Sequence, residues 1–428
     1  GYDHNFLEGN IHPTKEDLDK ISTDIPIIVI HTSIHMGVAN SKLLELTGIT
    51  KDSGEIPGGF IARDPETNEP LGLLEEMAMH AALPYVGNVF AASNIESLDD
   101  AQNFYIQNGI LTIQDGASIS DSVSLIRQFA DSSRLKCDVI SYPCFTMDDA
   151  PKIVNENKDC VNHYVNHFKI GGYKLVLDGS PQCKTAWMSK PYQDDDDNCG
   201  YPWLSDDEVQ NYIEKSLTDD SQLLCHCNGD AAGDQFLNIY EKCLANYPAD
   251  APQRALRPTM IHCQTTRNDQ LDKMAKLDMI ASIFVAHVNY WGDIHKKNLG
   301  DIRSSRISPV KDAINRDICV NFHTDTPVVM PYMFHTVWAA VTRQTRNGQI
   351  LGADQSIDVW EALKAVTINA AYGYFEENEK GSLKAGKIAD LIIVDQNPLT
   401  VDTMAIKDIK VLQSIKEGKV LYQRELTI

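Results

Sequence analysis

The chain has 428 residues, of which 43% are hydrophobic and 23% are charged, and its formal net charge is −22 at pH 7. This length allows roughly two or three ordinary domains, or a single α/β barrel with additions. The excess of acidic residues argues against nucleic-acid binding, which needs a clustered basic surface. No apolar run approaches the stretch of about 18 residues that spans a membrane, so we expect neither nucleic acid nor membrane as a partner.

The first part of the chain lacks a regular alternation of strands and helices. Residues 27–31 read as a strand and residues 41–46 as a short helix. Residues 54–70 are rich in glycine, proline and acidic side chains, which predicts a loop. We therefore interpret residues 1–105 as an insertion that covers the mouth of the domain that follows.

From about residue 110, short apolar runs alternate with longer amphipathic stretches, a pattern typical of repeated βα units around a parallel sheet. The predicted helices include residues 205–217, 232–247 and 267–277. The predicted strands are residues 110–114, 137–141, 171–177, 222–226, 258–262, 279–284 and 318–323. These strands are one short of a closed (β/α)8 barrel. The sequence thus predicts an α/β, TIM-type barrel over residues 106–375 whose first strand is missing.

The C-terminal segment, residues 376–428, has a different pattern. Residues 381–386 form a predicted turn, and residues 389–394 and 410–422 read as strands, which we expect to be antiparallel. We interpret this segment as a small β-sandwich beside the barrel.

The ten cysteines are scattered along the chain and include no C-x-x-C pair, so a structural zinc knuckle is not indicated. Buried, reduced thiols in a cytoplasmic protein fit this spacing better than a disulfide framework does.

Four polar residues end separate predicted strands: Lys174, His226, His262 and Asp325. In a parallel barrel the C-terminal strand ends share one rim, so these side chains are expected to converge. Imidazole nitrogens and carboxylate oxygens are ligands for Zn²⁺, and a lysine joins such a set once it is carboxylated. A single strand histidine is more often an ordinary core residue. It is the joint placement of the four residues that favours a metal site.

The segments around these residues resemble the amidohydrolase superfamily, and specifically its family 3 of metal-dependent hydrolases. The resemblance rests on residues 171–180, 226–232, 261–264, 323–328 and 381–395, in that order along the chain. It implies that Lys174, His226 and His262 bind one or two divalent ions, with Zn²⁺ the expected ion and Lys174 carboxylated. It also implies that Asp325 binds the metal and acts as the catalytic base.

One feature of the family is missing. Its barrel opens with a His-x-His pair on the first strand, and this chain contains no such pair. Either an upstream segment precedes this sequence or the chain is a degenerate member, and we favour the first explanation.

Several other residues are candidates for the substrate pocket: His35, His287, Trp291 and Arg343. His35 lies in a segment that resembles a family motif, and His287 and Trp291 follow the predicted strand 279–284. Structural polar contacts are an equal alternative for His287 and Trp291, and loop bracing is one for Arg343. His163 and His167 have helical i, i+4 spacing, for which an exposed helix is the simpler interpretation.

The sequence therefore predicts a metal-dependent hydrolase of C–N bonds in a small amide. Two alternatives stay open: a metal-free barrel that binds a ligand without chemistry, and a hydrolase of esters on the same scaffold. We also expect a homodimer, as is common in the superfamily.

Overall fold

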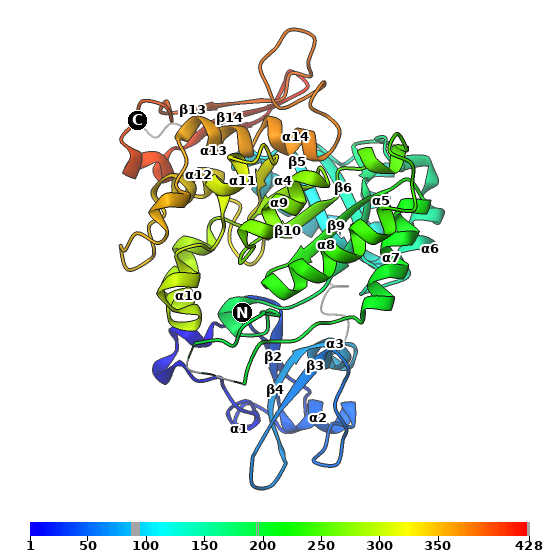
Figure 1. Ribbon diagram of the computed structural model, residues 1–428, viewed down its shortest axis with the longest axis vertical. Coiled ribbons are helices and arrows are strands. Elements are labelled where there is room, and N and C mark those ends of the chain that lie inside the picture. The colour runs from blue at the N-terminus through cyan, green and yellow to red at the C-terminus, as the bar shows by residue number, and fades with distance from the viewer. Residues whose placement is uncertain (87–94, 194, 196, 426–428) are drawn as a thin grey trace.

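The computed structural model describes residues 1–86, 95–193, 195 and 197–425 (Figure 1). The N-terminal sheet lies at one end of the molecule, parallel strands with their helices lie in the middle, and the C-terminal strands lie at the opposite end.

The central strands run parallel in the order in which they occur along the chain. Pairing is continuous through β5–β6–β7 and through β8–β9–β10–β11–β12, and a parallel bridge between Cys144 and Lys174 connects the two sets. Their bounds are β5 Thr112–Ser118, β6 Asp138–Pro143, β7 Phe168–Ile170, β8 Gly172–Val176, β9 Gln222–Cys227, β10 Thr259–His262, β11 Ile280–Ile283 and β12 Val320–Phe322. Each of the predicted strands is therefore present, and the third, at 171–177, is preceded by the separate strand β7.

Helices follow these strands and cover one face of the sheet. α7 begins with a capping box, in which the Glu208 carboxylate accepts the backbone N–H of Ser205 at 2.8 Å. The helices are α4 Ile95–Gln107, α5 Ser120–Asp131, α6 Ala150–Glu156, α7 Asp206–Thr218, α8 Asp230–Leu244, α9 Asn268–Lys276, α10 His287–Ser304, α11 Val310–Ile314, α12 Met333–Thr342, α13 Val359–Ala365 and α14 Ile368–Gly373. None of the helices in the described part of the chain is long and apolar enough to cross a membrane.

The main core lies between the strands and these helices. Phe236 and Leu237 of α8 and Met274 of α9 pack there with at most 1% of their surface exposed, against strand residues such as Met260. Burying one such side chain contributes about 1.5–3 kcal/mol. This layer fixes the positions of the strands and hence of their C-terminal ends.

The parallel sheet is not closed into a barrel by the described strands. β5 and β12 are its two edges, and neither pairs with another described strand on its free side. The mixed α/β content and the parallel order agree with the predicted barrel, but closure itself is not seen within residues 1–86, 95–193, 195 and 197–425.

The N-terminal part forms an antiparallel sheet with the strand order β1–β2–β4–β3 and its own core, which includes Leu43, Leu74 and Met79. Its elements are α1 Lys15–Asp19, β1 Ile28–Ile30, β2 Met36–Ala39, α2 Ser41–Thr47, β3 Gly59–Arg63, β4 Pro70–Glu76 and α3 Met77–Ala82. The loop predicted at 54–70 is wrong, because this stretch contains β3. Ile61 is the only buried side chain of β3, so the sequence shows no alternation there.

The C-terminal segment forms one antiparallel sheet of β13 Leu391–Val394, β14 Val411–Lys416 and β15 Lys419–Gln423. The antiparallel pairing was predicted correctly. The single strand expected at 410–422 is instead a hairpin that turns at Glu417 and Gly418, both with positive φ. Within the described part of this segment, β13, β14 and β15 form a single sheet, which contacts α4. A β-sandwich needs a second sheet, so the β-sandwich stays a prediction.

Buried charges join this C-terminal segment to the start of β6. The Asp138 carboxylate lies 2.9 Å from Nζ of Lys416, contacts Nζ of Lys380 and accepts a bond of 2.7 Å from Nδ1 of His167. The exposed helix predicted around His163 and His167 is wrong. His167 instead has a left-handed backbone with φ of 69° and precedes β7.

Candidate metal centre

The four predicted strand-end residues face one cavity. Lys174 lies on β8, His226 on β9 and His262 on β10, and Asp325 follows β12. All four line a cavity of about 940 Å³ at the C-terminal edge of the sheet. The same cavity extends between the unpaired edges of β5 and β12, which also contribute to its lining.

The two histidines are in direct contact. Nδ1 of His226 lies 3.1 Å from Nε2 of His262. The strand register pairs His226 with Ile261, so simple alternation would turn His262 to the other face. His262 and Cys263 have φ of 75° and 48°, and this left-handed turn directs the His262 ring back toward His226. Such backbone is uncommon outside glycine and often marks functional sites.

A third histidine completes a row of rings. Nε2 of His323 lies 3.1 Å from Nδ1 of His262, and the Ser282 hydroxyl lies 3.0 Å from Nδ1 of His323. Burial lowers the pKa of His262 well below its usual value and lowers the pKa of His323 to about 4. Both rings are therefore neutral at neutral pH, the form in which a ring nitrogen binds a metal ion.

Lys174 is buried, with 6% of its surface exposed, and no described residue forms a hydrogen bond or ion pair with its ammonium group. Burial is the main reason why its pKa is lowered, although Cys144 and Asp325 act in the opposite direction. A larger fraction of Lys174 therefore carries the neutral amine than in an exposed lysine.

Asp325 is the outlying member of the set. It is exposed, has φ of 53° and lies on the cavity wall. Within the described residues, it does not join His226 and His262 in a group whose ligand atoms all lie within 4.8 Å; the two such groups are Asp3–His4–His31 and Asp138–His167–Glu417.

Sequence reasoning missed the residues that hold His226. The fully buried Asp178 accepts backbone N–H groups of Asn228 at 3.0 Å and Gly229 at 2.7 Å, and its Oδ1 lies 3.3 Å from Nε2 of His226. Asn228 donates to the carbonyl of Gly179 at 2.8 Å and also contacts His226. Asp178 lies only four positions after Lys174, at the end of the same strand, and this placement was the available signal.

Of the candidate pocket residues, His35 lines the cavity and the other three do not. Nδ1 of His35 lies 2.9 Å from the buried Glu76 carboxylate, and its ring is 5.4 Å from that of His226. His287 packs against Phe284 and His262 outside the cavity. Trp291 donates to Asp3 at 2.9 Å.

Arg343 does not belong to a pocket. It is fully buried and donates to the carbonyls of Leu351, Ser308 and Ile307 at 3.0, 3.1 and 2.7 Å. Its role is to brace these loops, which corrects the pocket assignment.

These observations define an α/β protein with a histidine-rich cavity at the C-terminal edge of parallel strands, an arrangement suited to metal-assisted chemistry. The chain belongs to the amidohydrolase family, whose model matches residues 1–422.

The chain is also similar to individual proteins and to a solved structure. The chain is 26% identical to an N-substituted formamide deformylase from Arthrobacter pascens, over 96% of this chain and 76% of that protein. It is also 26% identical to the protein LONG AFTER FAR-RED 3 from Arabidopsis thaliana, over 99% of this chain and 73% of that protein. An uncharacterized metal-dependent hydrolase from Pyrococcus horikoshii shares the fold with a TM-score of 0.71, 23% identity, and coverage of 94% of this chain and 77% of that one.

Proposed function

We propose that this protein is a metal-dependent hydrolase that cleaves a C–N bond of a small amide. The observation that carries the proposal is the contact between His226 and the neutral His262, beside a buried lysine. The relative that deformylates N-substituted formamides supports an amide substrate.

The donor set fits a borderline divalent ion such as Zn²⁺. Two ligands of a tetrahedral zinc ion are about 3.3 Å apart, given bonds of about 2.0–2.1 Å. The nitrogens of His226 and His262 are 3.1 Å apart. Carboxylation of the Lys174 amine would convert it into a third, anionic ligand, and its lowered pKa favours the reactive neutral form. When bound here, the ion would lower the pKa of water toward about 7 and polarise the scissile carbonyl.

Asp325 is the proposed general base. Its exposed carboxylate stands on the cavity wall, where it can accept a proton from water and pass it to the leaving nitrogen. Asp178 and Asn228 hold His226 in position through the contacts described above.

Turnover by Asp325→Asn tests the proposal directly. We expect hydrolysis of N-substituted formamides and related amides to fall by about 10²–10⁴-fold, with unchanged melting temperature. Asp317→Asn is the matched control, because Asp317 is also an exposed aspartate with a left-handed backbone but lies before β12. An undiminished rate in Asp325→Asn would exclude the assigned role.

Metal analysis of the purified chain separates the alternatives. A binding protein without chemistry would carry no ion at His226 and His262, whereas an esterase on the same centre would carry the ion and hydrolyse esters in preference to amides.

A further inference from the structure

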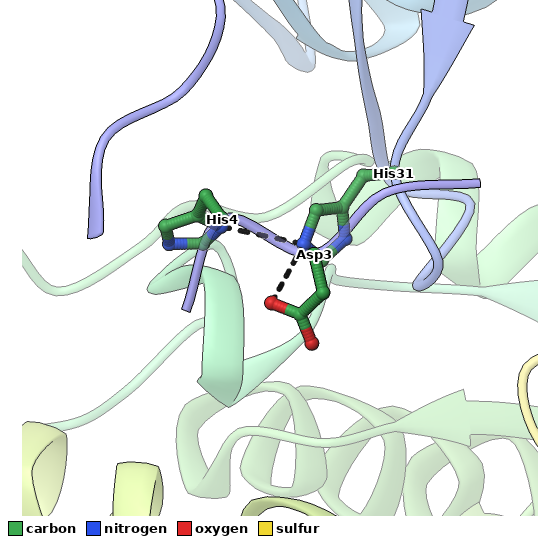
Figure 2. A group of neighbouring side chains, drawn as sticks. All are labelled: Asp3, His4 and His31. Atoms are coloured by element: carbon green, nitrogen blue, oxygen red, sulfur yellow. Dashed lines mark hydrogen bonds and ion pairs between the residues drawn. The ribbon is translucent and has the colours of Figure 1, made fainter. Parts of the chain in front are cut away.

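We propose that Asp3, His4 and His31 form a second site for a divalent transition-metal ion such as Zn²⁺, and that this ion fastens the N-terminal segment to the rest of the molecule. The site is separate from the cavity that holds His226 and His262, and the proposal does not depend on which reaction the protein catalyses. Figure 2 shows the three side chains, with both marked contacts meeting at His31.

The spacing of the three groups matches a single ion. Nε2 of His31 lies 3.3 Å from Oδ1 of Asp3 and 3.3 Å from Nδ1 of His4, and the ligand atoms of all three lie within 4.8 Å of one another. Two ligands of a tetrahedral zinc ion are about 3.3 Å apart. Two imidazole nitrogens and one carboxylate oxygen are also a ligand set that binds zinc in other proteins, with one position left open.

Asn5 donates its backbone N–H and its side-chain N–H to Oδ1 of Asp3, both at 3.0 Å, but these bonds do not account for the contacts at His31. Nε2 of His31 carries at most one proton, yet both Asp3 and His4 approach it at the same long distance. If that proton goes to Asp3, His4 is left facing an N–H that is already engaged. If His4 donates instead, a lone pair of His31 faces the Asp3 carboxylate. One cation between the three atoms would satisfy all of them at once.

The surrounding residues hold the three ligands as outer partners of a metal site do. Trp291 donates its Nε1–H to the second oxygen of Asp3 at 2.9 Å. The Ser33 hydroxyl lies 2.8 Å from Nδ1 of His31, and the backbone N–H of Ser33 donates to the same nitrogen at 3.1 Å, so the ring is held through Nδ1 with Nε2 facing Asp3 and His4. The His12 ring stacks on His4 with centroids 3.9 Å apart.

Burial favours the site further. The Asp3 side chain is 9% exposed and that of His31 is 0% exposed, so both are largely removed from water. A buried carboxylate is costly without a cationic partner. Among the described residues, Asp3 has His31 as its ion-pair partner, and no lysine or arginine pairs with it.

The other cluster of this kind in the described chain is Asp138–His167–Glu417. It differs from the Asp3 cluster because lysine side chains already pair with its carboxylates. Nζ of Lys416 lies 2.9 Å from Asp138 and 3.4 Å from Glu417, and Lys380 also contacts Asp138. Two ammonium groups already occupy the position of a cation there. We therefore assign the metal to the Asp3 cluster alone.

The ion would connect segments that are distant in the sequence. Asp3 and His4 belong to the first turn, His4–Phe6, and its cap, while His31 directly follows β1. Through Trp291 the cluster also contacts α10, which follows the parallel strand β11. Metal binding by such a set contributes to folding stability because the unfolded chain lacks the preformed site.

The test is zinc content and thermal stability of the purified chain and three variants, Asp3→Asn, His4→Gln and His31→Gln. After chelator treatment and return of Zn²⁺, each variant is expected to bind one ion fewer per chain and to lose the part of the zinc-dependent rise in melting temperature that this site supplies. His163→Gln, which replaces an exposed histidine away from the cluster, is the control. His262→Gln should keep the zinc ion at the Asp3 cluster, which His31→Gln loses.

Asp3→Asn distinguishes lost zinc binding from misfolding, because its amide oxygen still accepts the hydrogen bond from Trp291. Co²⁺ supplies an independent readout, since a tetrahedral site gives visible absorption bands that the three variants should weaken and His163→Gln should not. The proposal is overturned if all three variants bind as much zinc as His163→Gln and show the same zinc-dependent melting temperature.

Discussion

Neutralising Asp138 should destabilise the protein strongly, because its carboxylate is the centre of a buried cluster of positive charges. The side chain is 4% exposed and contacts Lys416 at 2.9 Å, His167 at 2.7 Å and Lys380. The substitution Asp138→Asn keeps the size of the side chain and removes only its charge.

The expected loss is about 3 kcal/mol of unfolding free energy. Removing one partner of a buried ion pair costs about 3–5 kcal/mol, because the other charge is left uncompensated. The lower end applies here, since Lys416 still has Asp390 at 2.9 Å and Lys380 still has Glu376 at 2.9 Å.

The pH dependence gives a second signature. Burial alone would raise the pKa of Asp138, but the bond from His167 and the charges of Lys380 and Lys416 outweigh it and hold the pKa well below its usual range. A depressed folded-state pKa contributes stability that is present above the unfolded pKa of about 3.9 and is lost as pH falls toward the folded value. The gap between wild type and Asp138→Asn should therefore be full at pH 7 and shrink below about pH 4.

Urea unfolding of both proteins at several pH values measures this gap. Asp131→Asn is the control, since Asp131 pairs with Arg127 at the surface with 53% of its side chain exposed, and such pairs contribute about 0–1 kcal/mol. The reasoning is refuted if Asp138→Asn costs no more than Asp131→Asn, or if the gap does not change with pH.

Two further substitutions test the packing around the site. In Gly229→Ala the new Cβ would lie 1.9 Å from the carbonyl oxygen of Trp187, so we expect a loss of at least about 1–3 kcal/mol by thermal unfolding, whereas Gly54→Ala meets nothing within 4 Å and should be neutral. Arg343→Lys cannot keep three hydrogen bonds to backbone carbonyls, so unfolding free energy should fall by about 2–4 kcal/mol while KM stays unchanged. A higher KM at unchanged stability would instead return Arg343 to the substrate pocket.

The sequence by itself determined the order of the βα units and placed Lys174, His226 and His262 on three successive strands. These are local properties, because apolar runs of strand length end at polar residues wherever parallel strands meet their loops. It also indicated the antiparallel C-terminal strands, whose register the tertiary structure then fixed. β3 escaped detection because only Ile61 of that strand is buried.

Only the tertiary structure decided how the side chains meet. His262 reaches His226 through a left-handed backbone that strand alternation does not predict, and Arg343 proved to be a buried brace. Trp291 and Asp3, 288 residues apart, are joined by one hydrogen bond. Contacts of this kind depend on where the packed helices and strands place each backbone in space. A sequence pattern does not give the spatial distance between residues that are far apart in the chain.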